Sequence, residues 1–448
     1  MNTDLSRLSR FSLAFWLSVL SAVCAGAATY LPLPDEELAR RAPVIVRARV
    51  VGQETRLASE EGRDLVVTAT RFLPLEVLKG SIEAETFRVE LPGGVLGNLS
   101  SWVPGTPSFT VGKEVLLFLA PSASDPDRFR LTEFGLAKFD LVEDRGGRRF
   151  AMRTAFRSAE DDVLSGRADI AMAVAGPDAR RPFRDAESFV SALRIAASGD
   201  EFPPVVYALP QAETRVPEAA APSWVNIGGT EGANRLYRWF WDTGRSPAAR
   251  VSASGTQSGL TDGSDGRSFV ENAALQWAGV SGATVRYSST SGSAQVVVNL
   301  EVASHSSYWS EPLPCGSGGI IGLGGPNASS SGGSFRGDGN YYAATSGTVW
   351  MRQVTGGCYS WQTFRTAVLH ELGHTLGLGH SNQGTSVHST TTADQWSSAV
   401  MVSAVSASAP SVPQGDDIQA ILWLYGPAAA EPTLPDRPRP ALSTRRSR

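Results

Sequence analysis

The strongest constraint on the fold of this chain is the histidine pattern HELGHTLGLGH at residues 370–380. The residues before it, 364–369, favour a helix with apolar side chains on one side, so the pattern should begin on a buried helix. On such a helix His370 and His374 lie about 40° apart around the axis and about 6 Å along it, so both rings can reach one metal ion. Glu371 borders the same face and can contact a metal-bound water without being a ligand.

The remainder of the pattern predicts a third ligand. Gly377 can adopt a left-handed conformation and end the helix, so that His380 turns back towards the same ion. Three neutral imidazoles leave the fourth position of a tetrahedral zinc ion (Zn2+) open, as in catalytic sites. We therefore expect one zinc ion on His370, His374 and His380, with Glu371 as the general base in peptide-bond hydrolysis. The shorter HExxH pattern also occurs on ordinary surface helices, but the added glycine and histidine favour a metal site.

The same residues resemble the metzincin zinc metalloproteases, and within them the matrixin-like branch. Ser381 follows the third histidine as it does in matrixins, and the DDIQAI and LYG segments between residues 416 and 426 resemble their C-terminal helix. The segments FVENAALQW (269–277), GATVRY (282–287) and QVVVNLEV (295–302) are similar to the first helix and the next two strands of the family. The resemblance covers about residues 235–427. It implies a secreted zinc endopeptidase whose α+β catalytic domain has a twisted mixed sheet and an active-site helix.

The resemblance also implies roles for residues outside the histidine pattern. Met401 should form a methionine turn beneath the zinc, held by hydrogen bonds that Asp416 and Asp417 accept. The strand that pairs with an extended substrate should lie at 319–324 and include Ile320, Ile321, Gly322 and Leu323. The alternatives are ordinary core packing for Met401 and helix capping for the two aspartates.

The chain departs from compact matrixins in several places. His305 is the only histidine upstream of the pattern, so we expect no second, structural zinc, and no cysteine lies between Cys24 and Cys315 to form a cysteine switch. The segment between His380 and Met401 is longer than in matrixins, so the specificity pocket cannot be transferred. Two acidic segments, 262–266 and 338–340, could supply oxygen ligands to Ca2+, but they lack the EF-hand spacing and are interpreted as turns.

The N-terminal residues predict export. Arg7 and Arg10 precede an apolar run at 11–23, which ends in small residues with an Ala-x-Ala pattern at 25–27. We expect residues 1–27 to be a signal peptide cleaved after Ala27, which makes the protein secreted, extracellular or periplasmic. A membrane anchor is the alternative, but about 14 apolar residues fall short of the ~20 that span a bilayer. Lipidation of Cys24 is disfavoured by the bulky Val23.

The predicted export also affects the expected oxidation state of the cysteines. Of the three in the chain, Cys24 leaves with the signal, and Cys315 and Cys358 remain in an oxidising compartment. A disulfide between them is the simplest interpretation. The alternative is a free thiol that acts as a metal ligand or a latency switch.

Composition shifts divide the rest of the chain into several segments. Residues 31–198 contain short apolar runs separated by glycine, proline and serine, which favour an all-β barrel or sandwich of unknown role. This segment resembles an uncharacterised β-domain that precedes bacterial secreted proteases. Residues 199–223 are rich in proline and alanine and predict an extended linker, 224–427 form the matrixin-like domain, and 428–448 are a disordered tail rich in proline and arginine. The chain is therefore expected to be multidomain.

Charge narrows the classes of partner. The net charge of -4 over 448 residues gives no electrostatic reason to expect nucleic-acid binding, and no segment predicts a membrane span in the mature protein. The expected partner is a protein or peptide substrate, and the sequence does not determine an oligomeric state. The alternative from another class is an exported binding or adhesion protein, in which the β-rich unit carries the function and the zinc site is structural.

Overall fold

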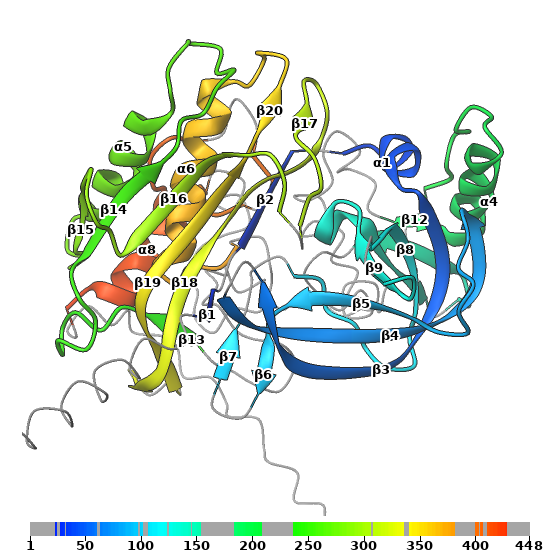
Figure 1. Cartoon of the computed structure of the whole chain (residues 1–448), viewed down its shortest axis with the longest axis horizontal. Helices are drawn as coiled ribbons and strands as arrows, with labels where there is room; N and C mark the ends of the chain where they lie inside the picture. The colour runs from blue at the N-terminus through cyan, green and yellow to red at the C-terminus, as the bar shows by residue number, and fades with distance from the viewer. Residues whose placement is uncertain are drawn as a thin grey trace, which may run out of the picture.

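The computed structural model describes most of the chain with several gaps. The described residues are 23–24, 27–31, 33–60, 63–96, 99–101, 106–122, 125–144, 146–153, 183–207, 236–305, 308–335, 340–380, 399–402, 404–405 and 410–427. They form two lobes side by side, one built on a barrel and the other on a mixed sheet covered by helices (Figure 1).

The first lobe contains a closed five-stranded barrel. Its strands follow the order β8-β3-β4-β5-β9, and β9 pairs back onto β8 to close the circle. The barrel strands are β3 (Val44–Glu60), β4 (Arg63–Lys79), β5 (Phe87–Pro92), β8 (Glu114–Pro121) and β9 (Arg128–Leu131). In β5 the buried side chains of Phe87, Val89 and Leu91 alternate with more exposed ones, because successive residues of a strand face opposite sides. Apolar alternation in the sequence thus fills the barrel interior.

Further elements extend this lobe from β8. They are β10 (Lys138–Glu143), β11 (Arg149–Arg153) and β12 (Phe183–Asp185), together with a small pair formed by β6 (Gly94–Leu96) and β7 (Leu99–Ser101). A 3₁₀ turn, η1 (Phe134–Ala137), precedes β10, and helix α4 (Ala186–Ala197) begins where the Asp185 side chain accepts a hydrogen bond from the Ser188 amide at 2.9 Å. The predicted linker begins against this lobe, since the Asp185 amide donates to the Val206 carbonyl at 2.8 Å. The rest of the predicted linker lies outside the described residues.

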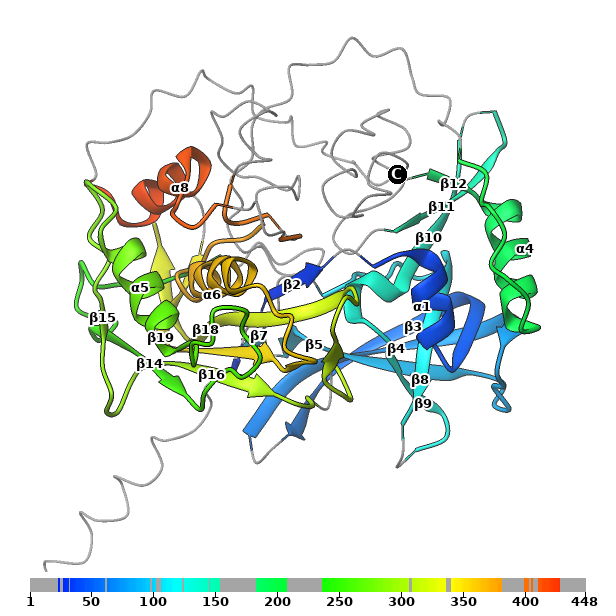
Figure 2. The ribbon, with the colours of Figure 1, turned by 90° about the horizontal axis from the view of Figure 1, so that it is seen from above.

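The second lobe is a mixed sheet with the order β18-β19-β16-β14-β15. Strands β14 (Ala249–Ser254), β15 (Tyr287–Ser289), β16 (Val296–Val302) and β19 (Asn340–Arg352) are parallel, and β18 (Gly319–Ser334) runs antiparallel to β19. Strand β13 (Leu236–Arg238) pairs with β19, and β17 (Leu313–Pro314) pairs with β20 (Val354–Thr355). Helices α5 (Arg267–Ala278), α6 (Trp361–Thr375) and α8 (Gly415–Tyr425) lie on one side of this sheet (Figure 2).

One predicted strand of this lobe is much shorter than expected. Only Tyr287 of the segment 282–287 belongs to β15. The Thr284 amide instead donates to the Tyr425 carbonyl at 2.8 Å, so this backbone is hydrogen-bonded to the end of α8 rather than to a neighbouring strand. The difference arises from a tertiary contact between segments far apart in the sequence.

The N-terminal segment links the two lobes. Strand β2 (Ala27–Leu31) pairs antiparallel with β18 of the mixed sheet, and the chain then enters helix α1 (Asp35–Arg41) of the barrel lobe. The short strand β1 (Val23–Cys24) also pairs with β18. Figure 1 shows β2 lying between the sheet and the barrel. The sequence did not predict any contact between residues 27–31 and the second lobe.

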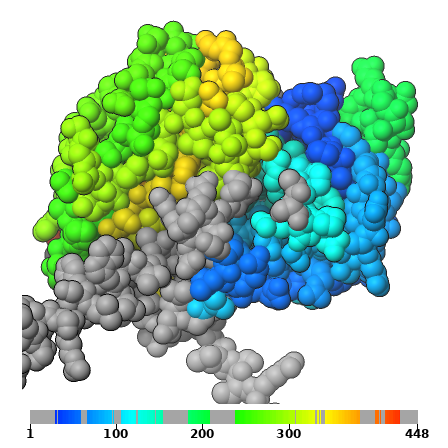
Figure 3. Space-filling model, viewed as in Figure 1, coloured from blue at the N-terminus to red at the C-terminus, as the bar shows by residue number. Residues whose placement is uncertain are grey.

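The lobes also share a hydrophobic core. Tyr308, Trp309, Ile320 and Leu323 come from the second lobe but pack in the same buried cluster as the barrel residues. In the space-filling view the two lobes are in direct contact along this boundary (Figure 3). Among the described residues, no helix combines the length and the apolar character needed to cross a membrane.

Candidate metal centre

Helix α6 places the first two histidines in the core of the second lobe. Its first turn is capped by the Ser360 hydroxyl, which accepts from the Thr363 amide at 3.4 Å. The helix is enclosed by other elements, and the Trp277 indole of α5 donates to the Leu369 carbonyl at 2.9 Å. His370 and His374 are both fully buried. Burial on every side explains the apolar residues that surround the histidine pattern.

A turn after α6 brings in His380. Gly377 has φ of 96°, the left-handed conformation expected from its place in the pattern. The last carbonyls of the helix have partners from elsewhere in the lobe: Thr375 accepts from the Trp239 indole at 2.8 Å and Leu376 accepts from the Tyr425 hydroxyl at 2.5 Å. These bonds satisfy groups that a helix end leaves unpaired and hold the turn in place.

The three imidazoles converge on one point. Their Nε2 atoms lie 2.8 Å (His370 to His374), 3.2 Å (His374 to His380) and 3.1 Å (His370 to His380) apart. The Nδ1 atom of His370 lies 2.7 Å from the Val400 carbonyl, and that of His374 lies 2.6 Å from the Leu378 carbonyl. A carbonyl only accepts, so these Nδ1 atoms carry the hydrogen and both Nε2 atoms present lone pairs to the centre.

This arrangement fits a bound cation. Nitrogen lone pairs facing one another at such distances repel, whereas a tetrahedral zinc with bonds of about 2.0–2.1 Å separates its ligand nitrogens by about 3.3 Å. Burial lowers the pKa of His370 to about 4, and it also lowers the pKa of His374 well below its usual value. Both rings are therefore neutral at physiological pH, the form that binds metal. His370, His374 and His380 are also the one group of potential ligands found to cluster among the described residues.

Glu371 lies beside the histidines on the side facing β18. It is fully buried, and its Oε1 atom accepts a hydrogen bond from the Thr29 hydroxyl of β2. Its Oε2 atom has no hydrogen-bond partner among the described residues. Burial raises the pKa of Glu371 well above its usual value, and hydrogen bonds from Thr29 oppose that shift. A buried carboxyl group with a raised pKa and one unpaired oxygen is suited to exchange a proton with a substrate or a water.

Met401 and Asp417 support the histidines from below. A side chain at Gly373 would overlap the Met401 sulfur, so Met401 packs directly under the helix between His370 and His374. The Asp417 carboxylate accepts from the Val400 amide at 2.8 Å and from the Met401 amide at 3.1 Å. The Val400 carbonyl in turn contacts His370. Asp416 is buried beside Asp417 at the start of α8.

The expected substrate strand lies beside Glu371 but already has a partner. Ile320, Ile321, Gly322 and Leu323 are in β18. Gly322 and Leu323 pair with β19 on one side and with β2 on the other, and Ile320 pairs with β2. A Cβ atom on Gly322 would come within 2.9 Å of the Glu371 Oε1 atom, so the missing side chain allows the helix to approach the strand. Ile321 packs in the core of the sheet lobe, whereas Ile320 and Leu323 pack with the barrel.

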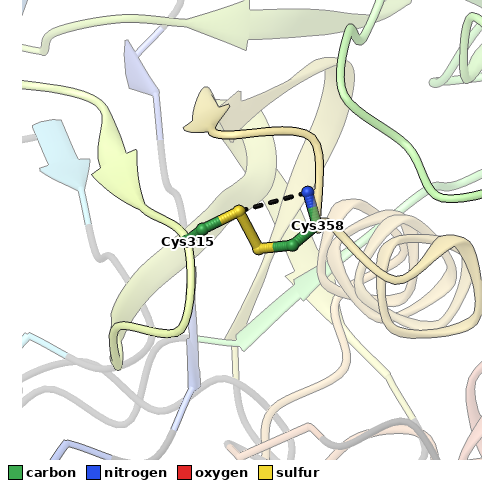
Figure 4. The surroundings of a disulfide bond; sticks show 2 residues. All are labelled: Cys315 and Cys358. Atoms are coloured by element: carbon green, nitrogen blue, oxygen red, sulfur yellow. Dashed lines mark hydrogen bonds between the residues drawn. A yellow bond between two sulfur atoms is a disulfide. The ribbon is translucent and has the colours of Figure 1, made fainter.

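The remaining predicted residues lie away from this centre. Cys315 and Cys358 form a disulfide with a Cα to Cα distance of 5.7 Å, next to β17 and β20 (Figure 4). Asp262 and Asp265 accept hydrogen bonds within the turn before α5, from Ser264 and from the Arg267 amide. His305 is buried against Tyr308 and Trp350. The acidic residue of the second calcium candidate, Asp338, lies outside the described residues.

Thr29 is the residue at this centre that the sequence did not reveal. It lies 342 positions before Glu371, and its short segment follows a predicted signal peptide, so no local pattern connects it to the histidines. Searches of protein-family models and of curated proteins found no match to this chain.

Proposed function

We propose that this protein is an exported, zinc-dependent endopeptidase of the metzincin type, with a matrixin-like catalytic domain at residues 224–427. The observation that carries the proposal is the convergence of three buried imidazoles beside a buried glutamate with one unpaired oxygen. The Met401 turn and its bonds to Asp417 support it. Protein or peptide is the proposed substrate class, because the pairing of β2 with β18 beside Glu371 shows that this strand edge accepts an extended chain.

Each group has a distinct role in this proposal. His370, His374 and His380 would hold a zinc ion, which would supply a Lewis acid able to activate a water molecule at neutral pH. Glu371 would act as the general base that takes a proton from the attacking water and returns it to the leaving amine. The β18 edge holds the peptide extended, so the scissile carbonyl stays beside the glutamate.

The competing function is a structural zinc site in a binding or adhesion protein. Full burial of the three histidines and Glu371 is the observation in its favour, because structural zinc sites are closed. A structural site does not need a glutamate next to its ligands, however. The buried Glu371 oxygen without a hydrogen-bond partner lowers the folding stability by about 1–3 kcal/mol. A structural site does not explain this loss of stability, so the unpaired oxygen favours the enzyme.

The test compares Glu371→Gln with its parent. Both are made in a chain that begins at Pro32, so that β2 is absent and the β18 edge is open. We expect both proteins to bind zinc stoichiometrically, and Glu371→Gln to lose at least about a hundredfold in kcat/KM on a peptide library. Glu271→Gln, the same change on the exposed side of α5, is the control and keeps full activity. Zinc binding without chelator-sensitive cleavage in the parent would instead support the structural site.

A further inference from the structure

Strand β2 occupies the position proposed for an extended substrate. It runs antiparallel to β18 with Leu31 opposite Gly319, Tyr30 opposite Ile320, Thr29 opposite Gly322, Ala28 opposite Leu323 and Ala27 opposite Gly324. This edge is where an added peptide would form its main-chain hydrogen bonds. A substrate cannot pair there while β2 is bound.

The other edge of β2 also forms a backbone hydrogen bond. The Tyr30 carbonyl accepts from the Val405 amide at 3.1 Å, and Tyr30 forms a parallel bridge with Ala404, just beyond the Met401 turn. The segment therefore lies between β18 and residues 404–405, with backbone bonds on both sides. A substrate peptide bound in the place of β2 would pair with the same two segments.

The centre of β2 reaches the proposed general base. Thr29 is fully buried, and its hydroxyl donates to the Glu371 Oε1 atom. Gly322 lies at the same point, where any side chain would contact that oxygen. A scissile carbonyl beside Glu371 would have to displace Thr29. The contact thus blocks the atoms that the proposed chemistry requires.

The barrel lobe anchors β2 on its C-terminal side. The Tyr30 side chain is buried in the barrel cluster, and its hydroxyl is hydrogen-bonded to the backbone of Gly135 in η1. At the start of α1, Asp35 is paired with Arg153 at 2.6 Å and with Arg184 at 2.5 Å, and all three side chains are buried. Tyr30 and Asp35 are therefore both attached to the barrel lobe.

A buried ion cluster holds the barrel against the same strand. Glu133, next to η1, pairs with Arg352 of β19 at 3.0 Å and with Arg41 of α1 at 2.9 Å. Its Oε2 atom also accepts from the Ile320 amide of β18 at 3.3 Å. Ile320 and Leu323 then pack into the barrel cluster. The barrel thus binds the part of the β18 edge next to β2 and keeps β2 in place.

We propose that the N-terminal lobe is an intramolecular inhibitor of the metal centre, with β2 as the inhibitory strand. This inference rests on the proposed endopeptidase function and assigns a role to the β-rich unit. Cleavage after Ala27 leaves residues 28–31 on the exported protein, so inhibition persists after export. Activity requires release of β2 from β18. A tethered strand competes at an effective concentration of about millimolar, so inhibition appears mainly as a raised KM.

The main test compares the exported chain starting at Ala28 with a chain starting at Pro32. We expect the shorter chain to show at least about tenfold higher kcat/KM on a peptide library, since the competing strand is gone. In hydrogen–deuterium exchange, amides 319–324 should lose protection in the shorter chain. A synthetic peptide AATYL, matching residues 27–31 of β2, should restore both inhibition and protection, and a scrambled peptide should not.

Two full-length variants address the risk that truncation disturbs folding. Thr29→Pro removes the backbone donor at the centre of β2 and should raise kcat/KM, whereas Thr29→Val removes only the hydroxyl bond to Glu371 and should raise it less. Thr55→Val makes the same change in the barrel, where the hydroxyl lies 3.4 Å from that of Thr68, and should leave activity unchanged. Unchanged activity in both Thr29 variants would contradict the inhibitor role.

Binding of a hydroxamate-capped tripeptide to the zinc-loaded proteins separates this inference from the proposed function. The probe needs an open β18 edge and a metal, but it needs no hydrolysis. If the probe binds only to the chain that starts at Pro32 and neither chain hydrolyses the peptide library, then β2 does block the metal centre, but the endopeptidase function is wrong. Equal hydrolysis and equal probe binding by both chains overturn the inhibitor role and leave the endopeptidase standing.

Discussion

Single residues decide whether the histidine pattern becomes a metal centre. The pattern specifies which side chains are candidate ligands, but His380 reaches the other two histidines only because the chain reverses at Gly377. That residue is left-handed, and a Cβ atom on it would overlap the Tyr237 carbonyl oxygen. The glycine is therefore required both by its backbone conformation and by the strand β13 packed against it.

Gly377→Ala should disrupt the position of His380. A left-handed alanine costs about 1–2 kcal/mol, and the overlap with Tyr237 adds about 1–3 kcal/mol. We expect a lower unfolding midpoint and zinc affinity reduced by about tenfold or more, measured by chelator competition.

Gly112→Ala is the matched control for this change. Gly112 has φ of 89° but open space around its Cβ position, so it carries only the conformational cost. Its zinc affinity should equal that of the parent. An equal loss of zinc affinity in Gly377→Ala and Gly112→Ala would show that the contact of residue 377 with Tyr237 does not position His380.

Secondary-structure elements differ in how far they follow from local sequence. The apolar spacing before His370 predicts a buried helix, and α6 spans Trp361–Thr375. The segment 269–277, similar to a family helix, lies within α5. In contrast, 282–287 forms hydrogen bonds with the end of α8 and contributes little to β15. Helices are stabilised by contacts three or four residues apart, whereas a strand needs a partner that local sequence does not specify.

The first turn of α8 provides a test at this scale, because it holds the Met401 turn. Asp417 accepts from the amides of Gln414, Val400 and Met401. In Asp417→Asn an amide group replaces one accepting oxygen, which should cost about 1–3 kcal/mol of folding stability. The Val400 carbonyl that contacts His370 should shift, and zinc affinity should fall by about 10–100-fold.

Asp185→Asn serves as the comparison for Asp417→Asn. Asp185 caps α4 in the barrel lobe with a single bond to the Ser188 amide. An asparagine caps a helix about as well, so stability and zinc affinity should both stay near the parent values. If Asp417→Asn binds zinc as tightly as Asp185→Asn, the α8 turn does not position His370.

At the scale of the whole molecule, buried ion pairs connect segments that are far apart in sequence. Asp35 joins α1 to β11 and β12 through Arg153 and Arg184, and Glu133 joins the barrel to the mixed sheet. Such pairs add little net stability over apolar packing, but the loss of one partner leaves a buried charge uncompensated. They therefore specify how the lobes and the N-terminal segment are placed.

The Asp35 pair predicts a dependence of stability on pH. Burial alone would raise the pKa of Asp35, but Arg184 and Arg153 outweigh it and lower the pKa below the ordinary 3.8. A lowered folded-state pKa contributes stability above the unfolded value, and this contribution is lost as pH falls through the folded value. Asp35→Asn should therefore destabilise the protein by about 3–5 kcal/mol at pH 7. The difference in unfolding free energy between the parent and this variant should decrease below about pH 4.

Urea unfolding of the parent and Asp35→Asn at pH 7 and pH 3 measures this effect. Asp125→Asn is the control, because Asp125 pairs with Arg88 at 2.5 Å at the surface and should change stability by less than about 1 kcal/mol. A gap between parent and Asp35→Asn that stays constant with pH would show that the charge of Asp35 is not what stabilises the N-terminal segment.

The sequence by itself determined the candidate ligands, the glutamate and the helix that carries them. These follow from a fixed spacing on one helix and a glycine that ends it, which are local properties. The β-rich character of residues 31–198 was also readable, because alternation of apolar residues is local. Local alternation did not distinguish a barrel from a sandwich, however. The barrel is closed by the pairing of β9 with β8, which only the tertiary structure shows.

Only the tertiary structure decided what lies on the β18 edge. The pairing of β2 with β18, the bond from Thr29 to Glu371 and the ion pair of Glu133 with Arg352 each join segments more than 100 residues apart. A free edge strand accepts almost any extended segment, because its main-chain groups are the same whatever the side chains. The partner of such an edge is therefore selected by packing around it, and here the barrel supplies that packing.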